Sequence, residues 1–210
     1  MLACDAQFVV VDFECTGAVE GFPDQPWQLG LAMLCRGQVD PGRTFTTLLQ
    51  VGNRPFNPYA PGRHARVREQ LLVAPRLADL WPALSAWLQD RPLAAHHAAT
   101  ERKFLEEAFP LHRLGPWVDT LELVRIAYPR HPTHRLEELV SVLGLGARVE
   151  TLCPGLAPHD ALYDAVACAA VLEHLLALPH WRGVTVDDLA AARSGWARGR
   201  RKGARGCASS

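Results

Sequence analysis

The stretch "FVVVDFECTG", residues 8–17, is a continuous apolar run that ends in two acidic residues. A run that is apolar at every position is typical of a β-strand covered on both faces. Asp12 and Glu14 lie two residues apart, so on a strand both side chains point to the same side of its carboxyl end. The stretch therefore predicts a central strand with two carboxylates standing together, where open α/β sheets usually place their ligands.

The rest of the chain predicts further strands and helices. Strands are expected over residues 28–39 and 43–51, joined by a turn at Asp40-Pro41-Gly42, and over the shorter segments 91–97 and 116–119. Residues 52–70 read as a long surface connection. Helices are expected over residues 74–90, 100–109, 120–128, 133–145 and about 160–178. This order predicts an α/β fold: a mixed sheet of about five strands with helices on both faces.

Charge is distributed unevenly along the chain. The 22 basic and 22 acidic residues cancel, so composition does not indicate a nucleic-acid-binding protein. Residues 193–210 hold six basic residues and no acidic one, which leaves a net charge of −6 on residues 1–192. The Gly-, Arg- and Ser-rich end from Ser194 is expected to be disordered. We interpret the chain as a domain over residues 1–180 and an extension over 181–210 with a basic tail.

Cysteine usage and hydropathy predict the compartment. The six cysteines are scattered without metal-ligand spacing, as expected of a protein from a reducing compartment. No basic-then-apolar leader is present, and no apolar run approaches the ~18 residues that a membrane span needs. The sequence therefore predicts a cytoplasmic protein without a membrane partner.

The two carboxylates of the first stretch need a cation or a proton. Asp12 and Glu14 repel each other on a buried strand end, and the loss of water raises the energy of both charges. A divalent cation between them relieves this, and oxygen ligands suit Mg²⁺ or Mn²⁺. The alternative is that Glu14 already lies in solvent and Asp12 caps the following turn.

A second acidic signal lies in "APHDALYDAVACAAVLEHLLAL", residues 157–178. On one continuous helix His159 and Asp164 would lie about 140° apart, so they converge only if His159 precedes the helix. Asp160 is a capping-type residue and supports a helix start at that point. Asp164 then lies on a buried helix without a local counter-charge, and a metal shared with Asp12 would stabilise it. The alternative for His159 is an ordinary surface histidine.

The third signal is "LAAHHAATERKFLEEAF", residues 93–109, a strand end followed by a helix with Glu101 in its first turn. The helix dipole favours an acid at this position without any function. From spacing alone Glu101 reads as part of a solvated helix start.

Together these segments resemble the motifs of the DEDDh 3′–5′ exonuclease superfamily, to which the proofreading subunit of bacterial replicative DNA polymerase belongs. The D-x-E-x-T-G motif is present as residues 12–17, and His159, Ala161 and Asp164 match H-x-A-x-x-D. The segment "RHARVREQLLVAP" with His64, "WVDTLELVRIAYP" and "THRLEELVSVLGL" resemble further family segments. The similarity covers residues 7–178, in the family's order and spacing.

The second motif departs from the family. The family has His-Asn-Ala-x-Phe-Asp, whereas this chain has His96-His97-Ala98-Ala99-Thr100-Glu101. Glutamate, one methylene longer than aspartate, occupies the metal-binding position, and no other acid lies between Asp90 and Glu101.

The resemblance implies a ribonuclease H-like fold and two-metal hydrolysis of phosphodiester bonds. Two divalent cations, Mg²⁺ or Mn²⁺, would be held by Asp12, Glu14, Glu101 and Asp164, and His159 would be the general base. The substrate would be the single-stranded 3′ end of DNA, with RNA as an alternative. The residues expected to contact it are Phe13, Thr16, Gly17, His64, His96 and His97.

Two other interpretations stay open. The first is a weakened exonuclease fold that binds nucleic-acid ends or a partner protein, which Glu101 favours and the intact first and third motifs oppose. The second is a proofreading subunit that is active only with a polymerase. A homodimer or a polymerase or repair partner is compatible with either.

Overall fold

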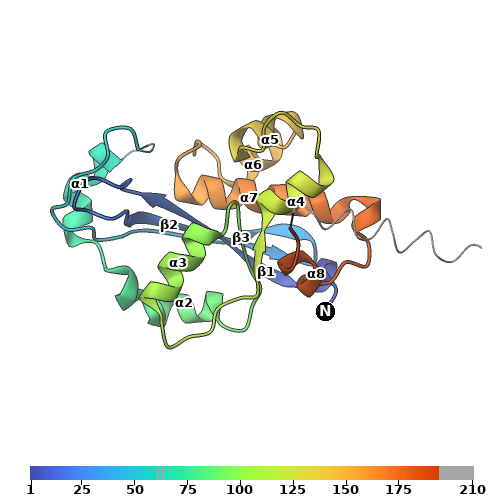
Figure 1. Ribbon diagram of the computed structural model, residues 1–210, viewed down its shortest axis with the longest axis horizontal. Coiled ribbons are helices and arrows are strands. Elements are labelled where there is room, and N and C mark those ends of the chain that lie inside the picture. Colours follow the sequence, from blue (N-terminus) through green and yellow to red (C-terminus); the bar gives the residue numbers. More distant parts are fainter. Residues whose placement is uncertain (61, 63, 194–210) are drawn as a thin grey trace, which may run out of the picture.

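The structure is a computed structural model that describes residues 1–60, 62 and 64–193. Its sheet has five strands in the order β3-β2-β1-β4-β5, which confirms the expected α/β fold with a mixed sheet (Figure 1). Strand β1 pairs antiparallel with β2 and parallel with β4; β2–β3 is antiparallel and β4–β5 parallel. The strands are β1 Gln7–Cys15, β2 Pro26–Cys35, β3 Gln38–Leu48, β4 Leu93–Ala95 and β5 Trp117–Asp119.

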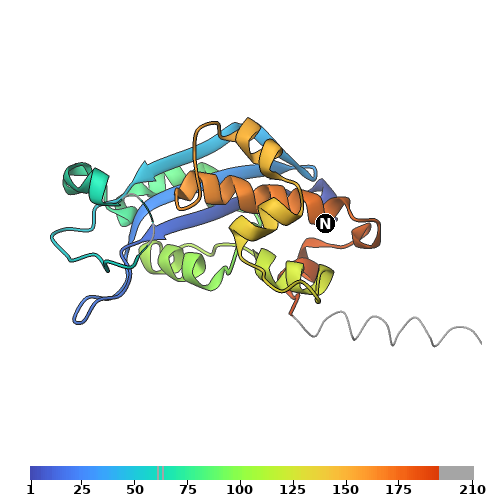
Figure 2. The ribbon, with the colours of Figure 1, turned by 90° about the horizontal axis from the view of Figure 1, so that it is seen from above.

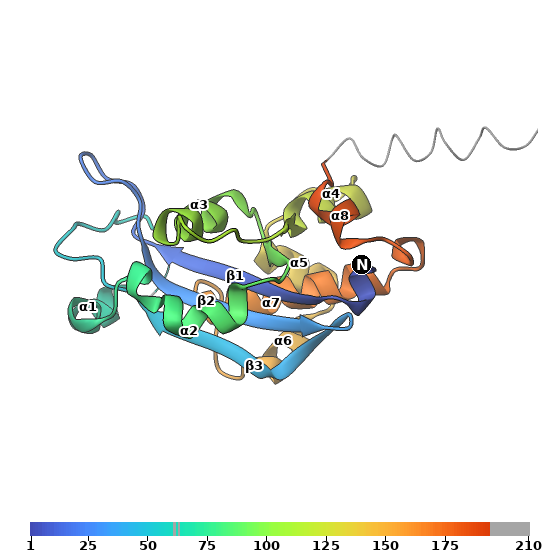
Figure 3. The same cartoon turned by 90° about the horizontal axis from the view of Figure 1, so that it is seen from below.

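Helices cover both faces of this sheet. The α-helices are α1 His64–Val73, α2 Trp81–Leu88, α3 Ala99–Ala108, α4 Thr120–Ala127, α5 Leu136–Val142, α6 Gly146–Leu152, α7 Ala161–Ala177 and α8 Val186–Ala190. Short 3-10 helices span Ala3–Asp5, Leu77–Leu80 and Pro179–Trp181. Seen from above, α7 lies along the sheet (Figure 2), whereas α2 and α3 lie on the opposite face (Figure 3).

The continuous apolar run of β1 is explained by these two layers. Phe8 and Val10 are buried in one core cluster with α7, and Val9, Val11 and Phe13 are buried in a second cluster with α2 and α3. Successive side chains of a strand point to opposite faces, so a strand between two helical layers needs an apolar residue at every position. This packing confirms that β1 is a central strand.

The expected turn at Asp40-Pro41-Gly42 is wrong. The chain turns at Arg36 and Gly37, which both have positive φ angles, 51° and 73°. Two left-handed residues between Cys35 and Gln38 form the kind of tight hairpin whose twist matches the flanking strands. Residues 40–42 instead lie in β3, where the register with β2 shifts. A proline is tolerated there because β3 is an edge strand.

Other expectations need adjustment. The surface connection over 52–70 ends earlier than expected, because α1 begins at His64. Helices α6 and α8 were not expected, and both are short. Trp181, Val186 and Leu189 are buried in the same core cluster as α7, while the domain limit at residue 180 stays a prediction. The basic tail over 194–210, with its expected disorder, lies outside the described residues. Within the described part of the chain, no helix has the length and apolar character needed to span a membrane.

Candidate active site

The acidic end of β1 is enclosed by the fold. Glu14 is only 6% exposed, so the alternative in which it lies in solvent is wrong. Asp12 is half-buried. It lies opposite Gly30 of β2, and Glu14 lies opposite Gln28 of the same strand. The strand therefore carries both carboxylates into the interior, as the i, i+2 spacing predicts.

The start of α7 brings the third motif to the same place. Asp160 is the N-cap and its Oδ1 accepts a hydrogen bond from the backbone N–H of Leu162 at 3.0 Å. His159 precedes the helix with a positive φ of 66°, and its backbone N–H donates to Asp164 Oδ2 at 3.0 Å. This confirms that His159 lies in the loop and Asp164 in the first turns of the helix. The left-handed residue at position 159 is what turns the two side chains toward each other.

Gly30 permits this approach, and the sequence analysis missed it. A Cβ atom at Gly30 would lie 2.0 Å from the backbone oxygen of Ala161 and 2.5 Å from the nitrogen of Leu162. The first turn of α7 therefore packs directly on the backbone of β2, opposite Asp12. Gln28, one pleat further along β2, adds a weak contact, since its Oε1 accepts from the N–H of Ala161 at 3.4 Å. A lone glycine inside an apolar strand was the available signal for a close backbone approach.

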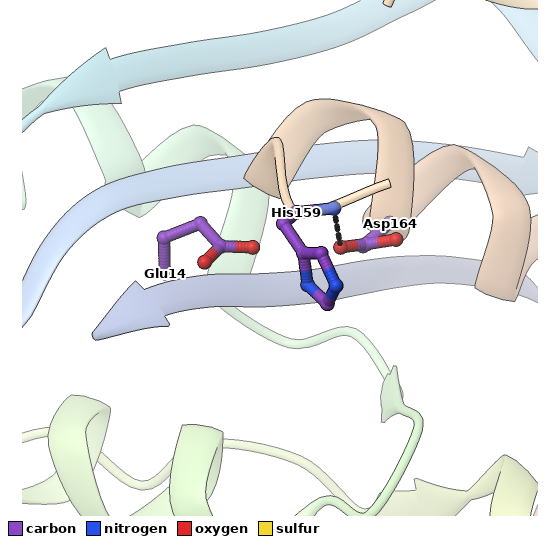
Figure 4. A group of neighbouring side chains, drawn as sticks. All are labelled: Glu14, His159 and Asp164. Carbon is purple, nitrogen blue, oxygen red and sulfur yellow. Dashed lines mark hydrogen bonds between the residues drawn. The ribbon is translucent and has the colours of Figure 1, made fainter. Parts of the chain in front are cut away.

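Three side chains converge closely enough to share one ion. Glu14, His159 and Asp164 each offer a ligand atom, and these atoms lie within 4.8 Å of one another. Figure 4 shows the Glu14 carboxylate from β1 facing the His159–Asp164 pair from the start of α7. Carboxylate oxygens suit Mg²⁺ or Mn²⁺, so Glu14 and Asp164 fit the cation that the sequence analysis expects, and His159 lies beside them.

Glu101 lies on the other side of the site, in the first turn of α3. It is 7% exposed, so its interpretation as part of a solvated helix start is wrong. Its buried Oε2 has no hydrogen-bond partner among the described residues. A buried carboxylate oxygen without a partner is costly unless a proton or a cation satisfies it.

The four acids lie in one electrostatic neighbourhood. Burial raises the pKa of Glu14 to about 8, of Glu101 to about 7 and of Asp164 to about 6. Burial also raises the pKa of Asp12 well above its ordinary value, and the negative charges of Asp164, Glu101 and Glu14 raise it further. Mutual repulsion of this kind is relieved when a divalent cation binds.

A cavity of about 400 Å³ opens onto three of these acids, Asp12, Glu14 and Asp164. Asp12, Glu14, His159 and Asp164 line it together with the ends of two loops, and no lysine or arginine is among its described lining residues. The charged side chains among the described lining residues are therefore all acidic, and one imidazole lies beside them. Phosphate binding therefore requires a cation to offset the acids.

Phe13, Thr16 and Gly17, expected to contact substrate, lie at the rim or behind it. Phe13 and Gly17 line the cavity, and the Phe13 ring packs edge-on against Phe104 with centroids 5.7 Å apart. Thr16 is fully buried, and its hydroxyl accepts from the N–H of Gln25 at 3.1 Å. Thr16 thus holds the loop after β1, while contact with a substrate stays a prediction for all three.

The three histidines expected to contact substrate do not gather at the cavity. His64 stacks on Phe56 with ring centroids 4.5 Å apart. The ring of His96 is engaged at both nitrogens: Nε2 donates to the backbone oxygen of His134 at 2.8 Å, and Nδ1 lies 3.0 Å from Thr120 Oγ1. His97 is exposed. Their substrate contacts stay predictions, and His96 has a clear structural role.

Asp119 is a structural acid that sequence reasoning did not single out. Its carboxylate accepts from the backbone N–H groups of His97, Ala98 and Leu121 at 3.0 to 3.2 Å. It therefore caps α4 and ties down the segment that leads into α3 and Glu101. The Asp-Thr-Leu sequence at the start of α4 was the signal, since aspartate is a preferred N-cap.

The chain is similar in sequence to a family of exonucleases and to segments of longer bacterial proteins. The family model RNase_T, described as an exonuclease, matches residues 9–172. The chain is 26% identical over 178 residues to the DNA polymerase III PolC-type of Halalkalibacterium halodurans, covering 80% of this chain and 11% of that protein. It is 25% identical over 188 residues to the 3′-5′ exonuclease DinG of Staphylococcus aureus, covering 88% of this chain and 19% of that protein. The chain thus spans less than a fifth of the length of these curated relatives.

Solved structures share the fold. Exonuclease X in complex with 5′ overhanging duplex DNA superposes with a TM-score of 0.65 at 23% identity, covering 87% of this chain and 97% of that one. The nuclease domain of 3′hExo, a DEDDh family member bound to rAMP, gives a TM-score of 0.63 at 17% identity, covering 84% and 94%. With a family match over most of its length and its two intact motifs at one cavity, the chain belongs to the RNase_T exonuclease family and is a member of the DEDDh 3′–5′ exonuclease superfamily.

Proposed function

We propose that the chain is a metal-dependent exonuclease that removes nucleoside monophosphates from the 3′ end of single-stranded DNA. The observation that carries this proposal is the convergence of Glu14, His159 and Asp164 within 4.8 Å at the mouth of a cavity that also holds Asp12. Acids that raise one another's pKa, next to an exposed histidine, are typical of a hydrolytic site rather than of a structural ion pair.

Asp12, Glu14, Glu101 and Asp164 would hold two divalent cations, Mg²⁺ or Mn²⁺. Such ions stabilise the negative charge of a phosphodiester under attack and lower the pKa of water. The raised pKa of each acid and the unsatisfied Oε2 of Glu101 support this assignment, because a divalent cation would stabilise the charged form of each acid and satisfy that oxygen. In this proposal Glu101 helps to hold one of the two cations from its buried position on α3, although its side chain is one methylene longer than the family's aspartate.

His159 would accept the proton that the attacking water releases. Its imidazole is exposed at the cavity, so a proton can pass from it to solvent. The bond from its N–H to Asp164 Oδ2 holds the backbone at His159 and does not involve either ring nitrogen. An imidazole that is in contact with solvent is a common general base in hydrolytic sites.

DNA is the proposed substrate, with RNA as the alternative. Exonuclease X was solved with DNA and 3′hExo with rAMP, so this fold serves both. The relatives are a polymerase III PolC-type and DinG, which supports a polymerase or repair partner as part of the same proposal. A homodimer is also compatible with it.

The first test is a time course on 5′-labelled single-stranded DNA with Mg²⁺ or Mn²⁺, analysed on a denaturing gel. Wild type, Asp164→Ala and Asp79→Ala are compared. Asp79 is an exposed acid on the 3-10 helix Leu77–Leu80 and controls for loss of negative charge alone. We expect a ladder that shortens from the 3′ end, is slowed about 100-fold or more by Asp164→Ala, and disappears with EDTA.

An intact oligonucleotide with both metals, repeated on RNA and on duplex DNA, would refute the exonuclease proposal. The second candidate, a binding or scaffold protein with this fold, would then be favoured. Glu101 is the observation behind that candidate, since it departs from the family's second motif. A gel-shift with the same oligonucleotides in EDTA would decide whether the chain binds nucleic-acid ends without cutting them.

A further inference from the structure

Tyr59 is an aromatic residue whose side chain is not packed into the core of the domain. Its side chain is 92% exposed, although it is among the residues that line the carboxylate cavity. Exposing an aromatic ring of this size leaves a large apolar area in water and contributes nothing to the core. An exposed aromatic residue beside a candidate active site, rather than elsewhere on the surface, suggests a ligand contact.

The backbone that carries Tyr59 is firmly held. Asn57 anchors it: the Asn57 Oδ1 accepts from the N–H of Tyr59 at 2.9 Å, and its Nδ2 donates to Ala18 O at 3.2 Å. The N–H of Asn57 also donates to Thr16 O at 2.8 Å, directly after β1. Gly17 shows how close the two loops lie, because a Cβ there would be 2.6 Å from the Asn57 Cβ.

These hydrogen bonds hold the backbone at Tyr59 close to the loop after β1, beside the metal-binding acids. The loop after β1 and the loop that carries Tyr59 project beyond the same end of the sheet (Figure 3). Arg54 adds a further tie between them, since its NH1 donates to Pro23 O at 2.7 Å. A side chain on a held backbone loses little further freedom when a ligand covers it.

We propose that Tyr59 is a positioning residue on which a nucleobase next to the scissile phosphodiester stacks; this inference rests on the proposed nuclease function. Tyr59 lines the same cavity as Asp12, Glu14 and Asp164, so its ring is available to a nucleotide whose phosphate enters that cavity. Every base has an aromatic face, so stacking on tyrosine holds the strand without selecting its sequence.

The proposal makes the effect of Tyr59 depend on the presence of a base. Two single-stranded DNA substrates separate this role from a structural one: an ordinary strand, and the same strand whose last two 3′ nucleotides lack their bases. The variants are Tyr59→Ala, Tyr59→Phe and Phe22→Ala. Phe22 is the matched control, because it is 44% exposed on the neighbouring loop and is not among the described cavity-lining residues.

On the ordinary strand we expect Tyr59→Ala to lower kcat/KM about five-fold or more, mainly through KM. On the strand with abasic ends, wild type and Tyr59→Ala should have equal kcat/KM values. Tyr59→Phe should match wild type on both strands, because stacking needs the ring and not the hydroxyl. Phe22→Ala should also match wild type, and thermal melting should confirm that every variant is folded.

Two results would overturn the inference: no loss with Tyr59→Ala on the ordinary strand, or an equal loss on both strands. If wild type cuts neither strand, the proposed function fails separately. The inference is then decided by binding in EDTA of a strand with 2-aminopurine at its 3′ end. Quenching of that fluorescence by wild type and Tyr59→Phe but not by Tyr59→Ala supports stacking, and any other pattern refutes it.

Discussion

The two halves of the acidic site differ in how they are built. The β1–α7 half consists of Asp12, Glu14, His159 and Asp164, and the ligand atoms of the last three lie within 4.8 Å of one another. The β4–α3 half consists of residues 96–101, in which only Glu101 carries an acid. Glu101 is buried, but it is not part of the cluster of ligand atoms that lie within 4.8 Å of one another.

The supporting contacts of the two halves explain the difference. In the β1–α7 half the bond from the N–H of His159 to Asp164 Oδ2 joins two residues of the ligand cluster itself. In the β4–α3 half the polar groups serve the fold: Asp119 accepts from the N–H of His97, and both nitrogens of the His96 ring are engaged. In this chain the motif that departs from the family pattern is thus the one whose neighbouring polar groups stabilise the fold.

The largest effect is expected from Gly30→Ala, which breaks the β1–α7 half without touching a ligand. The added Cβ would lie 2.0 Å from Ala161 O, so α7 must move away from β2. We expect a cost of about 3 kcal/mol and a Tm lower by roughly 6–12 °C. Because a displacement of about 1 Å can cost 100-fold in rate, activity should fall about 100-fold.

Gly146→Ala is the matched control for this substitution. Gly146 is the first residue of α6, and a Cβ there meets no atom within 4 Å. It should keep or slightly raise the Tm, as a glycine replaced without strain usually does. Normal melting and normal activity of Gly30→Ala would show that the close approach of α7 to the sheet does not build the site.

The next effect concerns the β4–α3 half. Glu101→Gln should lower activity and Mn²⁺ affinity about ten-fold, because it keeps the size of the side chain and removes its charge. Glu101→Asp restores the family's residue, and we expect it to raise activity. Both are compared with Glu107→Gln, an exposed glutamate on the same helix in a 3.9 Å contact with Lys103. Calorimetric titration measures the Mn²⁺ affinity and the gel assay measures the rate. Equal affinities and equal rates for all three variants would show that Glu101 has no role in the site.

A smaller effect is expected in the pH dependence of stability. Burial raises the pKa of Glu14 from 4.5 to about 8, so the folded chain binds more protons than the unfolded chain between these values. Stability of the metal-free protein therefore falls as pH rises through this range. In EDTA the Tm should drop from pH 5.5 to pH 8, whereas with Mn²⁺ the stabilisation by metal should be greater at pH 8, since metal ligands must be deprotonated.

Glu14→Gln tests the source of this slope. The variant removes a carboxyl group whose pKa burial raises to about 8, and it should flatten the dependence of Tm on pH in EDTA. Parallel curves for wild type and Glu14→Gln would place the titrating group elsewhere.

The smallest effect is expected outside the site. Deleting residues 194–210 removes five basic residues, which we expect to add non-specific affinity for phosphate. The slope of log K against log salt for single-stranded DNA should become shallower by up to about 3, with kcat unchanged. Fluorescence anisotropy between low and moderate salt measures this slope, and an identical slope for the full chain would rule the contribution out.

Much of the fold could be read from the sequence because its signals are local. The uniform apolar run of β1 indicated a strand between two layers, and Asp160 marked the start of α7. The turn was misplaced because Asp40-Pro41-Gly42 has the usual turn residues. Arg36 adopts a left-handed conformation, which an arginine in the sequence does not indicate. Short helices such as α8 escaped because tertiary packing rather than periodicity stabilises them.

The sequence by itself determined which chemistry the chain carries: the order and spacing of Asp12, Glu14, His159 and Asp164 and the substitution at Glu101. Tertiary structure alone decided that Glu14 and Glu101 are buried and that Gly30 lets α7 reach the sheet. It alone also placed the exposed Tyr59 beside the acids. The physical reason is that residue type and spacing follow from covalent order. Burial, distance and pKa depend on which segments far apart in the sequence pack together.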